Sequence, residues 1–115
     1  MSRVIPKNRL RAFSKQKGRC YYCDVPMWLE RPEEYSGNYG IRESQAKRFR
    51  CTAEHLLARQ DGGTNAMVNI VAACFFCNLT RHRASKALSP EKYRKRVLLR
   101  LRCQKWHPRE FHHLL

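Results

Sequence analysis

The spacing of apolar residues is helical near both ends of the chain. In residues 8–17, large apolar side chains stand three apart, as on one helix face, and Gly18 follows as a stop. Near the other end, Ser89 followed by Pro90 is a typical helix start, because serine caps free backbone N–H groups and proline fits the first turn. We expect short helices over 8–17 and 91–105.

The middle of the chain has the pattern of a β-hairpin. Residues 51–58 form a short apolar run, 68–75 are rich in β-branched residues, and an Asp-Gly-Gly turn lies between them. Good helix formers follow over 77–88. Residues 29–50 carry proline and glycine with no sustained period, which indicates a connection of uncertain structure. The pattern predicts one α+β domain over residues 1–115.

Charge narrows the class of partner. The chain has 24 Lys and Arg against 9 Asp and Glu, a formal net charge of +15. Such an excess favours a polyanion, and nucleic acid first; a merely solvated basic surface is the alternative. No window approaches the roughly 18 apolar residues of a spanning helix, so no membrane partner is expected. The first residues lack the apolar run of a signal peptide, which favours a cytoplasmic, reducing location.

Four of the six cysteines form two CxxC pairs, Cys20 with Cys23 and Cys74 with Cys77. In a reducing compartment such pairs indicate metal ligands more than disulfides. Four thiolates are the closed tetrahedral donor set of structural Zn²⁺, which would stabilise a domain of only 115 residues. Disulfides or ordinary core cysteines are the alternative. Cys51 and Cys103 remain, and we expect both to be buried as small apolar residues.

A second group of polar residues lies around the hairpin and its following helix: Glu54, His55, Asn69, Asn78 and His82. Asn78 and His82 are four residues apart, so they share a helix face. Cys77 directly precedes Asn78, which ties the start of that helix to the zinc site. Taken singly, each residue has an ordinary structural reading as a core histidine, a surface carboxylate, a turn or a cap.

In order along the chain, the segments "CYYC", "AEHLLARQDGGTNAMVNI" and "CFFCNLTRH" resemble the HNH endonuclease family. The resemblance covers about residues 20–83 and leaves the basic helical extension 90–115 outside it. It implies a ββα-metal core with a four-cysteine zinc site and flanking N- and C-terminal helices. The sequence departs from many members of the family at Glu54, where they have Asp, and at Ala58, where they have Pro.

The resemblance also implies roles for the polar group. His55 would be the general base that deprotonates an attacking water, and an imidazole with a pKa of about 6.5 suits that task. Glu54, Asn78 and His82 would ligate a catalytic Mg²⁺, Mn²⁺ or Ni²⁺, among which these ligands do not choose. Asn69 would hold the hairpin loop and, with it, His55. The predicted reaction is metal-dependent hydrolysis of DNA phosphodiester bonds.

Basic residues near these motifs are the expected phosphate contacts: Arg48, Arg50, Arg81, Arg83, Lys86, Arg94, Lys95 and Arg96. Leu98, Leu99 and Leu101 are expected to face the core. The alternative function is a non-catalytic, zinc-stapled DNA-binding module, but Glu54 beside His55 favours an enzyme, since a binding module needs no base next to a metal ligand. RNA as substrate, and a monomer or a homodimer as the assembly, stay open.

Overall fold

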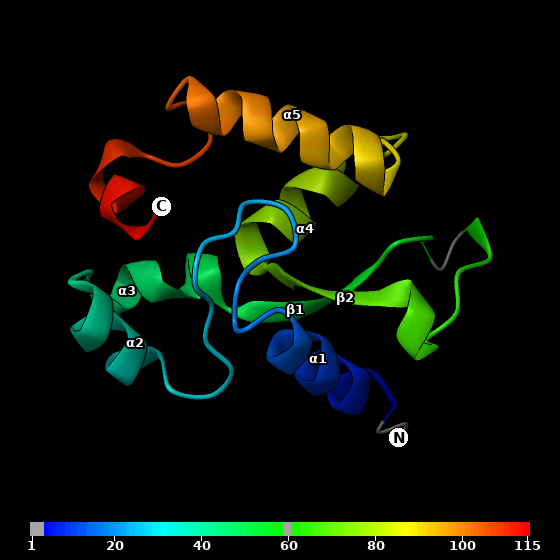
Figure 1. The fold of residues 1–115 in the computed structure, drawn as a ribbon, viewed down its shortest axis with the longest axis horizontal. Coiled ribbons are helices and arrows are strands. Elements are labelled where there is room, and N and C mark those ends of the chain that lie inside the picture. The colour runs from blue at the N-terminus through cyan, green and yellow to red at the C-terminus, as the bar shows by residue number, and fades with distance from the viewer. Residues whose placement is uncertain (1–3, 59–60) are drawn as a thin grey trace.

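A two-stranded antiparallel sheet lies at the centre of the computed structural model, which describes residues 4–58 and 61–115 (Figure 1). Strand β1 (Cys51–His55) pairs with strand β2 (Ile70–Cys74), and Cys51 stands opposite Cys74. The predicted hairpin is therefore present, although its first strand ends at His55, three residues early. The carbonyl groups of His55 and Leu56 instead accept hydrogen bonds from Arg81, which takes the place of a longer ladder.

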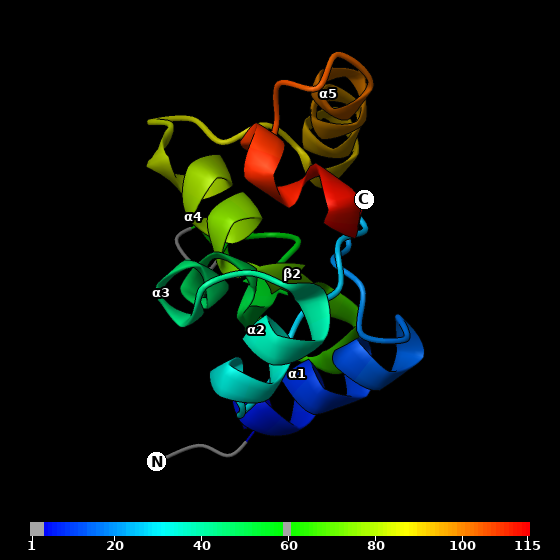
Figure 2. The same cartoon turned by 90° about the vertical axis from the view of Figure 1, so that its left-hand side faces the viewer.

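Helices cover both faces of this sheet. Helix α1 (Val4–Lys15) packs against both strands on one side, and helix α4 (Phe75–Arg83) packs against them on the other. Helix α5 (Pro90–Arg102) lies beyond α4, so that Figures 1 and 2 show the sheet between α1 and the α4–α5 layer. The described part of the chain is thus an α+β fold in which a loop with the 3₁₀ helix η3 (Met67–Asn69) joins β1 to β2, and α4 follows β2 directly.

The segment expected to be an irregular connection contains three short helical elements: α2 (Pro32–Tyr39), α3 (Glu43–Ala46) and the 3₁₀ helix η1 (Lys47–Phe49). Helix α2 has proline in its first turn and ends at Gly40, which has a left-handed φ of 64°. Both are ordinary helix boundary signals. The sequence pattern does not predict α2, because this helix buries only Tyr35 and therefore has no helical period of apolar residues.

The predicted helix ends differ from the observed ones by a few residues. Helix α1 begins at Val4 and ends at Lys15. Just after it, Gly18 has a left-handed φ of 76°, and its N–H donates to the carbonyl of Phe13 at 2.9 Å. Helix α4 ends at Arg83 rather than continuing to 88, because the chain folds back and the Leu88 carbonyl accepts from Arg81 Nε at 3.1 Å. A last 3₁₀ helix, η4 (Arg109–Leu114), lies near the C-terminal end.

The hydrophobic core is aromatic and collects residues from most elements: Tyr22, Val25, Tyr35, Phe49, Tyr93, Val97, Trp106 and Phe111 are all buried. In α5 the inward face is Tyr93, Val97 and the partly buried Leu101, spaced four apart. Leu98 and Leu99 are exposed, so the expectation that they face the core is wrong; one and two steps of about 100° from Val97 turn them outward.

Candidate functional site

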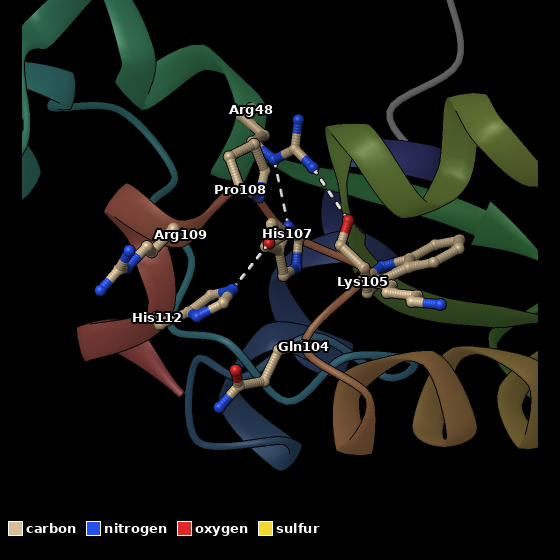
Figure 3. A pocket seen from close by; sticks show the side chains of 8 residues that line it. Arg48, Gln104, Lys105, His107, Pro108, Arg109 and His112 are labelled. Atoms are coloured by element: carbon tan, nitrogen blue, oxygen red, sulfur yellow. Dashed lines mark hydrogen bonds between the residues drawn. The ribbon is translucent and has the colours of Figure 1, made fainter.

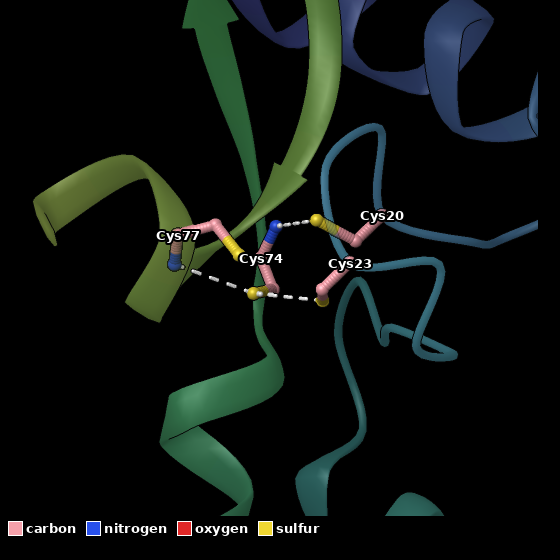
Figure 4. A group of neighbouring side chains, drawn as sticks. All are labelled: Cys20, Cys23, Cys74 and Cys77. Carbon is pink, nitrogen blue, oxygen red and sulfur yellow. Dashed lines mark hydrogen bonds between the residues drawn. The ribbon is translucent and has the colours of Figure 1, made fainter. Parts of the chain in front are cut away.

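The four CxxC cysteines converge into one buried group, the four-cysteine cluster of Cys20, Cys23, Cys74 and Cys77 (Figure 4). All four sulfur atoms lie within 4.8 Å of one another, and Cys23 Sγ is 3.9 Å from Cys74 Sγ. A tetrahedral ion with Zn–S bonds of about 2.3 Å spaces its sulfurs by about 3.8 Å. The cysteines are free thiols rather than disulfides, so the donor set fits a bound metal ion such as zinc.

Several N–H groups point at these sulfurs. Cys20 Sγ accepts from the backbone N–H of Tyr22 at 3.4 Å and of Cys74 at 3.3 Å, and Cys77 Sγ accepts from the indole N–H of Trp106 at 3.3 Å. Such outer hydrogen bonds stabilise thiolates and fix their direction.

The pKa values of Cys20 and Cys77 are shifted in opposite directions. Burial raises the pKa of Cys20, but hydrogen bonds from the other three cysteines outweigh it and hold that pKa well below its ordinary value. Burial, followed by hydrogen bonds within the cluster, raises the pKa of Cys77. A thiolate is therefore favoured at Cys20 over Cys77, and a bound cation would supply the charge that favours further deprotonation.

Of the two leftover cysteines, one prediction is confirmed and one is wrong. Cys51 is buried in the core, and burial raises its pKa to about 12, which keeps the thiol protonated. Cys103 is exposed at the end of α5. It follows Arg102, the last residue of α5, and precedes Gln104, which has a left-handed φ of 56°.

Glu54 is a buried carboxylate, 1% exposed, between β1 and α4. Its Oε2 accepts from the Tyr22 hydroxyl at 3.1 Å and from Arg81 Nη1 at 3.2 Å, and its Oε1 lies 2.8 Å from His82 Nε2. Burial of an unpaired carboxylate is costly, so this set of partners explains how the residue is tolerated. The side chain of His82 is 31% exposed, so the pair opens to solvent on the histidine side.

Arg81 is the main correction to the predicted surface. It is buried, and its guanidinium also donates to the carbonyls of His55 at 3.1 Å, Leu56 at 3.2 Å and Leu88 at 3.1 Å. It therefore belongs to the interior and does not offer a free charge to phosphates. One signal was available, because Arg81 stands four residues after buried Cys77 and so shares its helix face.

His55 is held by a residue that the sequence did not single out. Its Nε2 lies 2.9 Å from Asn65 Oδ1, and the Asn65 carbonyl accepts from the side chain of Asn8 on α1 at 2.9 Å. Asn8 is itself buried. No sequence signal distinguishes Asn65 from other polar loop residues, because its role arises from contacts 10 and 57 residues distant.

Asn69 makes the loop-holding hydrogen bonds that we expected. Its Oδ1 accepts from the Leu57 N–H at 2.8 Å, and its Nδ2 donates to the carbonyls of Leu57 at 3.0 Å and Thr64 at 2.7 Å. The Asn69 backbone carbonyl also accepts from Leu56 N–H at 2.9 Å. These contacts fix the chain immediately after His55.

Asn78 lies on α4 with its side chain directed to β1. Its Nδ2 donates to Thr52 Oγ1 at 3.0 Å and to the carbonyl of Ala53 at 3.4 Å. Among the three predicted ligands of a catalytic cation, Glu54 and His82 are thus in direct contact, whereas Asn78 binds the neighbouring strand.

The remaining predicted phosphate contacts are exposed: Arg50, Arg83, Lys86, Arg94, Lys95 and Arg96. Arg48 is half-buried and lines a hollow of about 850 Å³ beside the C-terminal segment (Figure 3). Its Nε donates to His107 Nδ1 at 3.1 Å, its Nη2 donates to the Trp106 carbonyl at 3.4 Å, and it stacks 3.5 Å from the Phe76 ring centre. Arg48 thus joins η1 to residues 106–107.

No family model matches the chain, and neither a curated protein nor a solved structure matches it. Over residues 4–58 and 61–115, no helix is both long and apolar enough to cross a lipid bilayer. The class defined by fold and site is an α+β protein with a buried four-cysteine cluster suited to a metal ion.

Proposed function

We propose that this protein is an HNH-type endonuclease that hydrolyses DNA phosphodiester bonds with the help of a divalent cation. The observation that carries the proposal is the contact between Glu54 and His82, 2.8 Å apart, where β1 meets α4. The order β1, β2, α4 and the four-cysteine cluster at the start of α4 support it.

Glu54 and His82 are the residues that would hold the cation. Together they offer one carboxylate oxygen and one imidazole nitrogen, a mixed donor pair compatible with Mg²⁺, Mn²⁺ or Ni²⁺. His82 reaches solvent while Glu54 does not, so the cation would enter from the histidine side. When bound, a divalent cation supplies positive charge that stabilises the phosphorane-like transition state and the leaving oxygen.

His55 is the proposed general base. An amide oxygen only accepts hydrogen bonds, so the contact with Asn65 Oδ1 assigns the proton of neutral His55 to Nε2. The lone pair on Nδ1 is then free to take a proton from water. The hydrogen bonds of Asn69 to Leu57 hold the backbone that carries this ring.

Arg81 connects Glu54, a proposed cation ligand, to His55, the proposed general base. The same Nη1 donates to Glu54 Oε2 at 3.2 Å and to the His55 carbonyl at 3.1 Å. Because this guanidinium is buried, it would hold the cation-binding carboxylate and the base-bearing residue in fixed relation without contacting substrate. Pre-organisation of this kind is what positioned catalysis requires.

Exposed basic side chains on α4 and α5 would bind the phosphate backbone. Arg83 directly follows His82 at the end of α4, and Arg94, Lys95 and Arg96 lie on α5, which packs beside it. Binding through such contacts weakens steeply as salt concentration rises.

The test is cleavage of supercoiled plasmid by the zinc-loaded protein with Mg²⁺, Mn²⁺, Ni²⁺ or EDTA, beside His55→Ala. His113→Ala is a matched control, since His113 is exposed and bonds only the Tyr39 carbonyl among the described residues. The proposal expects cation-dependent cutting by wild type and His113→Ala but not by His55→Ala. DNA shifted but uncut by every variant would indicate the binding module, and a parallel RNA substrate separates the two nucleic acids.

A further inference from the structure

We infer that Tyr22 is a positioning residue that links the four-cysteine cluster to Glu54, so that metal in the cluster sets the geometry of the Glu54–His82 pair. The inference rests on the proposed function only for the cation-binding role of that pair. The linkage itself follows from contacts among buried residues and concerns Tyr22, which the sequence patterns did not single out.

Tyr22 lies inside the first CxxC turn, between Cys20 and Cys23, and is 1% exposed. Its backbone N–H donates to Cys20 Sγ at 3.4 Å, while its hydroxyl donates to Glu54 Oε2 at 3.1 Å. One residue therefore touches a sulfur of the cluster with its main chain and the buried carboxylate with its side chain.

The ring of Tyr22 has little freedom to move. Tyr93 packs edge-on against it with ring centres 4.8 Å apart, and the Tyr93 hydroxyl donates to the Cys77 carbonyl at 2.7 Å. Tyr21 packs edge-on from another side at 5.2 Å. A shift of the CxxC turn would therefore move the hydroxyl relative to Glu54, because the ring cannot reorient independently.

Among the described residues, the three side chains that hydrogen-bond to Glu54 come from segments anchored in the four-cysteine cluster. Tyr22 belongs to the first turn, and Arg81 and His82 lie on α4, whose N-cap is Cys74 and whose first turn contains Cys77. The two hydrogen bonds to Oε2 leave Oε1 directed at His82. The carboxylate orientation is thus set from the cluster through both of its partner segments.

A coupling free energy between the two metal sites follows. If metal in the four-cysteine cluster holds Tyr22 and α4 in this arrangement, the Glu54–His82 pair is pre-organised for a cation, and each metal favours binding of the other. Removal of a hydrogen-bond partner behind a metal ligand typically weakens metal affinity by about 10- to 100-fold.

The experiment compares Tyr22→Phe with Tyr35→Phe in the zinc-loaded protein. Tyr35 is a matched control, because it is also buried and its hydroxyl donates to a backbone carbonyl, that of Pro26 at 2.6 Å, away from Glu54. The absorption of separate cobalt-substituted samples first establishes that the four-cysteine cluster forms in both variants. The ring ¹⁵N shift of His82, recorded with no second cation, then reports its contact with Glu54, and Mn²⁺ titration reports affinity.

We expect Tyr22→Phe to move the His82 shift and weaken Mn²⁺ binding by about 10- to 100-fold, with Tyr35→Phe unchanged in both. Either an unchanged His82 shift or unchanged or tighter Mn²⁺ binding in Tyr22→Phe would overturn the inference. If Tyr22→Phe does not fold, exchange of Zn²⁺ for the larger Cd²⁺ in the wild-type cluster tests the same link. A change in the ring ¹⁵N shift of His82 supports the link, and an unchanged shift refutes it.

These readings separate the inference from the proposed function. The His82 shift needs neither Mn²⁺ nor DNA, so it tests the link even if the wild-type protein cuts nothing. Conversely, wild-type cutting with an unmoved His82 shift in Tyr22→Phe leaves the nuclease standing and removes the link.

Discussion

Nε2 of His55 lies 2.9 Å from Oδ1 of Asn65, and Asn65 is in turn bound through its carbonyl to Asn8 of α1. Helix α1 therefore supports the proposed base from the opposite side of the sheet to α4. The contact also fixes which ring nitrogen is free, so loss of Asn65 would disturb His55 directly.

Asn65→Ala should lower the single-turnover rate of DNA cleavage while leaving cation affinity unchanged, because it frees the His55 ring without touching Glu54 or His82. General-base catalysis contributes about 10²- to 10⁴-fold, and the loss should stay smaller than for His55→Ala. Asn65→Asp should retain much of the rate, since a carboxylate still accepts from Nε2. Asn38→Ala on the exposed face of α2 is the control. A rate equal to wild type in Asn65→Ala would contradict the positioning role.

Loss of the metal from the four-cysteine cluster should unfold the protein. Such sites contribute on the order of 10 kcal/mol to the folding of small domains, and Cys77 is completely buried with its sulfur bound to Trp106. We expect Cys77→Ser, or chelation of wild type, to abolish the cooperative melt seen by circular dichroism. Cys103→Ser, at an exposed position, should melt within about 0.5 kcal/mol of wild type. A cooperative, unshifted melt of metal-free protein would exclude a structural metal.

Two neighbouring arginines of α4 should behave differently. Arg81→Ala removes the buried partner of Glu54 and should cost about 3–5 kcal/mol in the free energy of unfolding, measured with urea. Arg83→Ala, at an exposed position, should leave stability within about 0.5 kcal/mol. It should instead weaken DNA binding and reduce the salt slope of affinity by about 1. Equal stability of the two variants would show that the Arg81–Glu54 pair does not support the fold.

Stability should fall between pH 6.5 and 4 because of His107. Burial, with Arg48 as the second cause, lowers the pKa of this ring to about 4 in the folded protein. The unfolded chain takes up the proton near pH 6.5, so it binds more protons than the folded chain across this window, and stability decreases as pH falls. The full contribution is about 3 kcal/mol. His107→Phe should flatten this part of the urea-derived pH profile, and an identical slope in both proteins would contradict the assignment.

The elements that depend on local pattern were predicted well. The CxxC spacings identified the four cysteines that cluster, and the apolar runs around the Asp-Gly-Gly turn identified the hairpin. The spacing of Asn78 and His82 placed both on the side of α4 that meets β1. Each of these relations spans a few residues of backbone, where geometry follows directly from sequence.

The sequence does not show which residues the predicted site residues bind, even where, as for Arg81, helical spacing from Cys77 indicates the buried face. Tyr22 and Arg81 meet at Glu54 from positions 32 and 27 residues distant, and Asn65 meets His55 across the hairpin loop. Arg81 shows the physical reason most clearly. In a chain of net charge +15, an arginine beside a predicted site is expected in solvent unless it pairs with a buried carboxylate. Glu54 becomes such a partner only when β1 and α4 pack together.

Single-turnover cleavage of an end-labelled DNA duplex by zinc-loaded wild type and His55→Ala, with Mg²⁺ or with EDTA, tests the proposed hydrolysis most directly. The account predicts a cation-dependent rate for wild type and a rate for His55→Ala that is lower by about 100-fold or more. Equal rates for the two proteins, or bound duplex that stays intact with every cation, would contradict it.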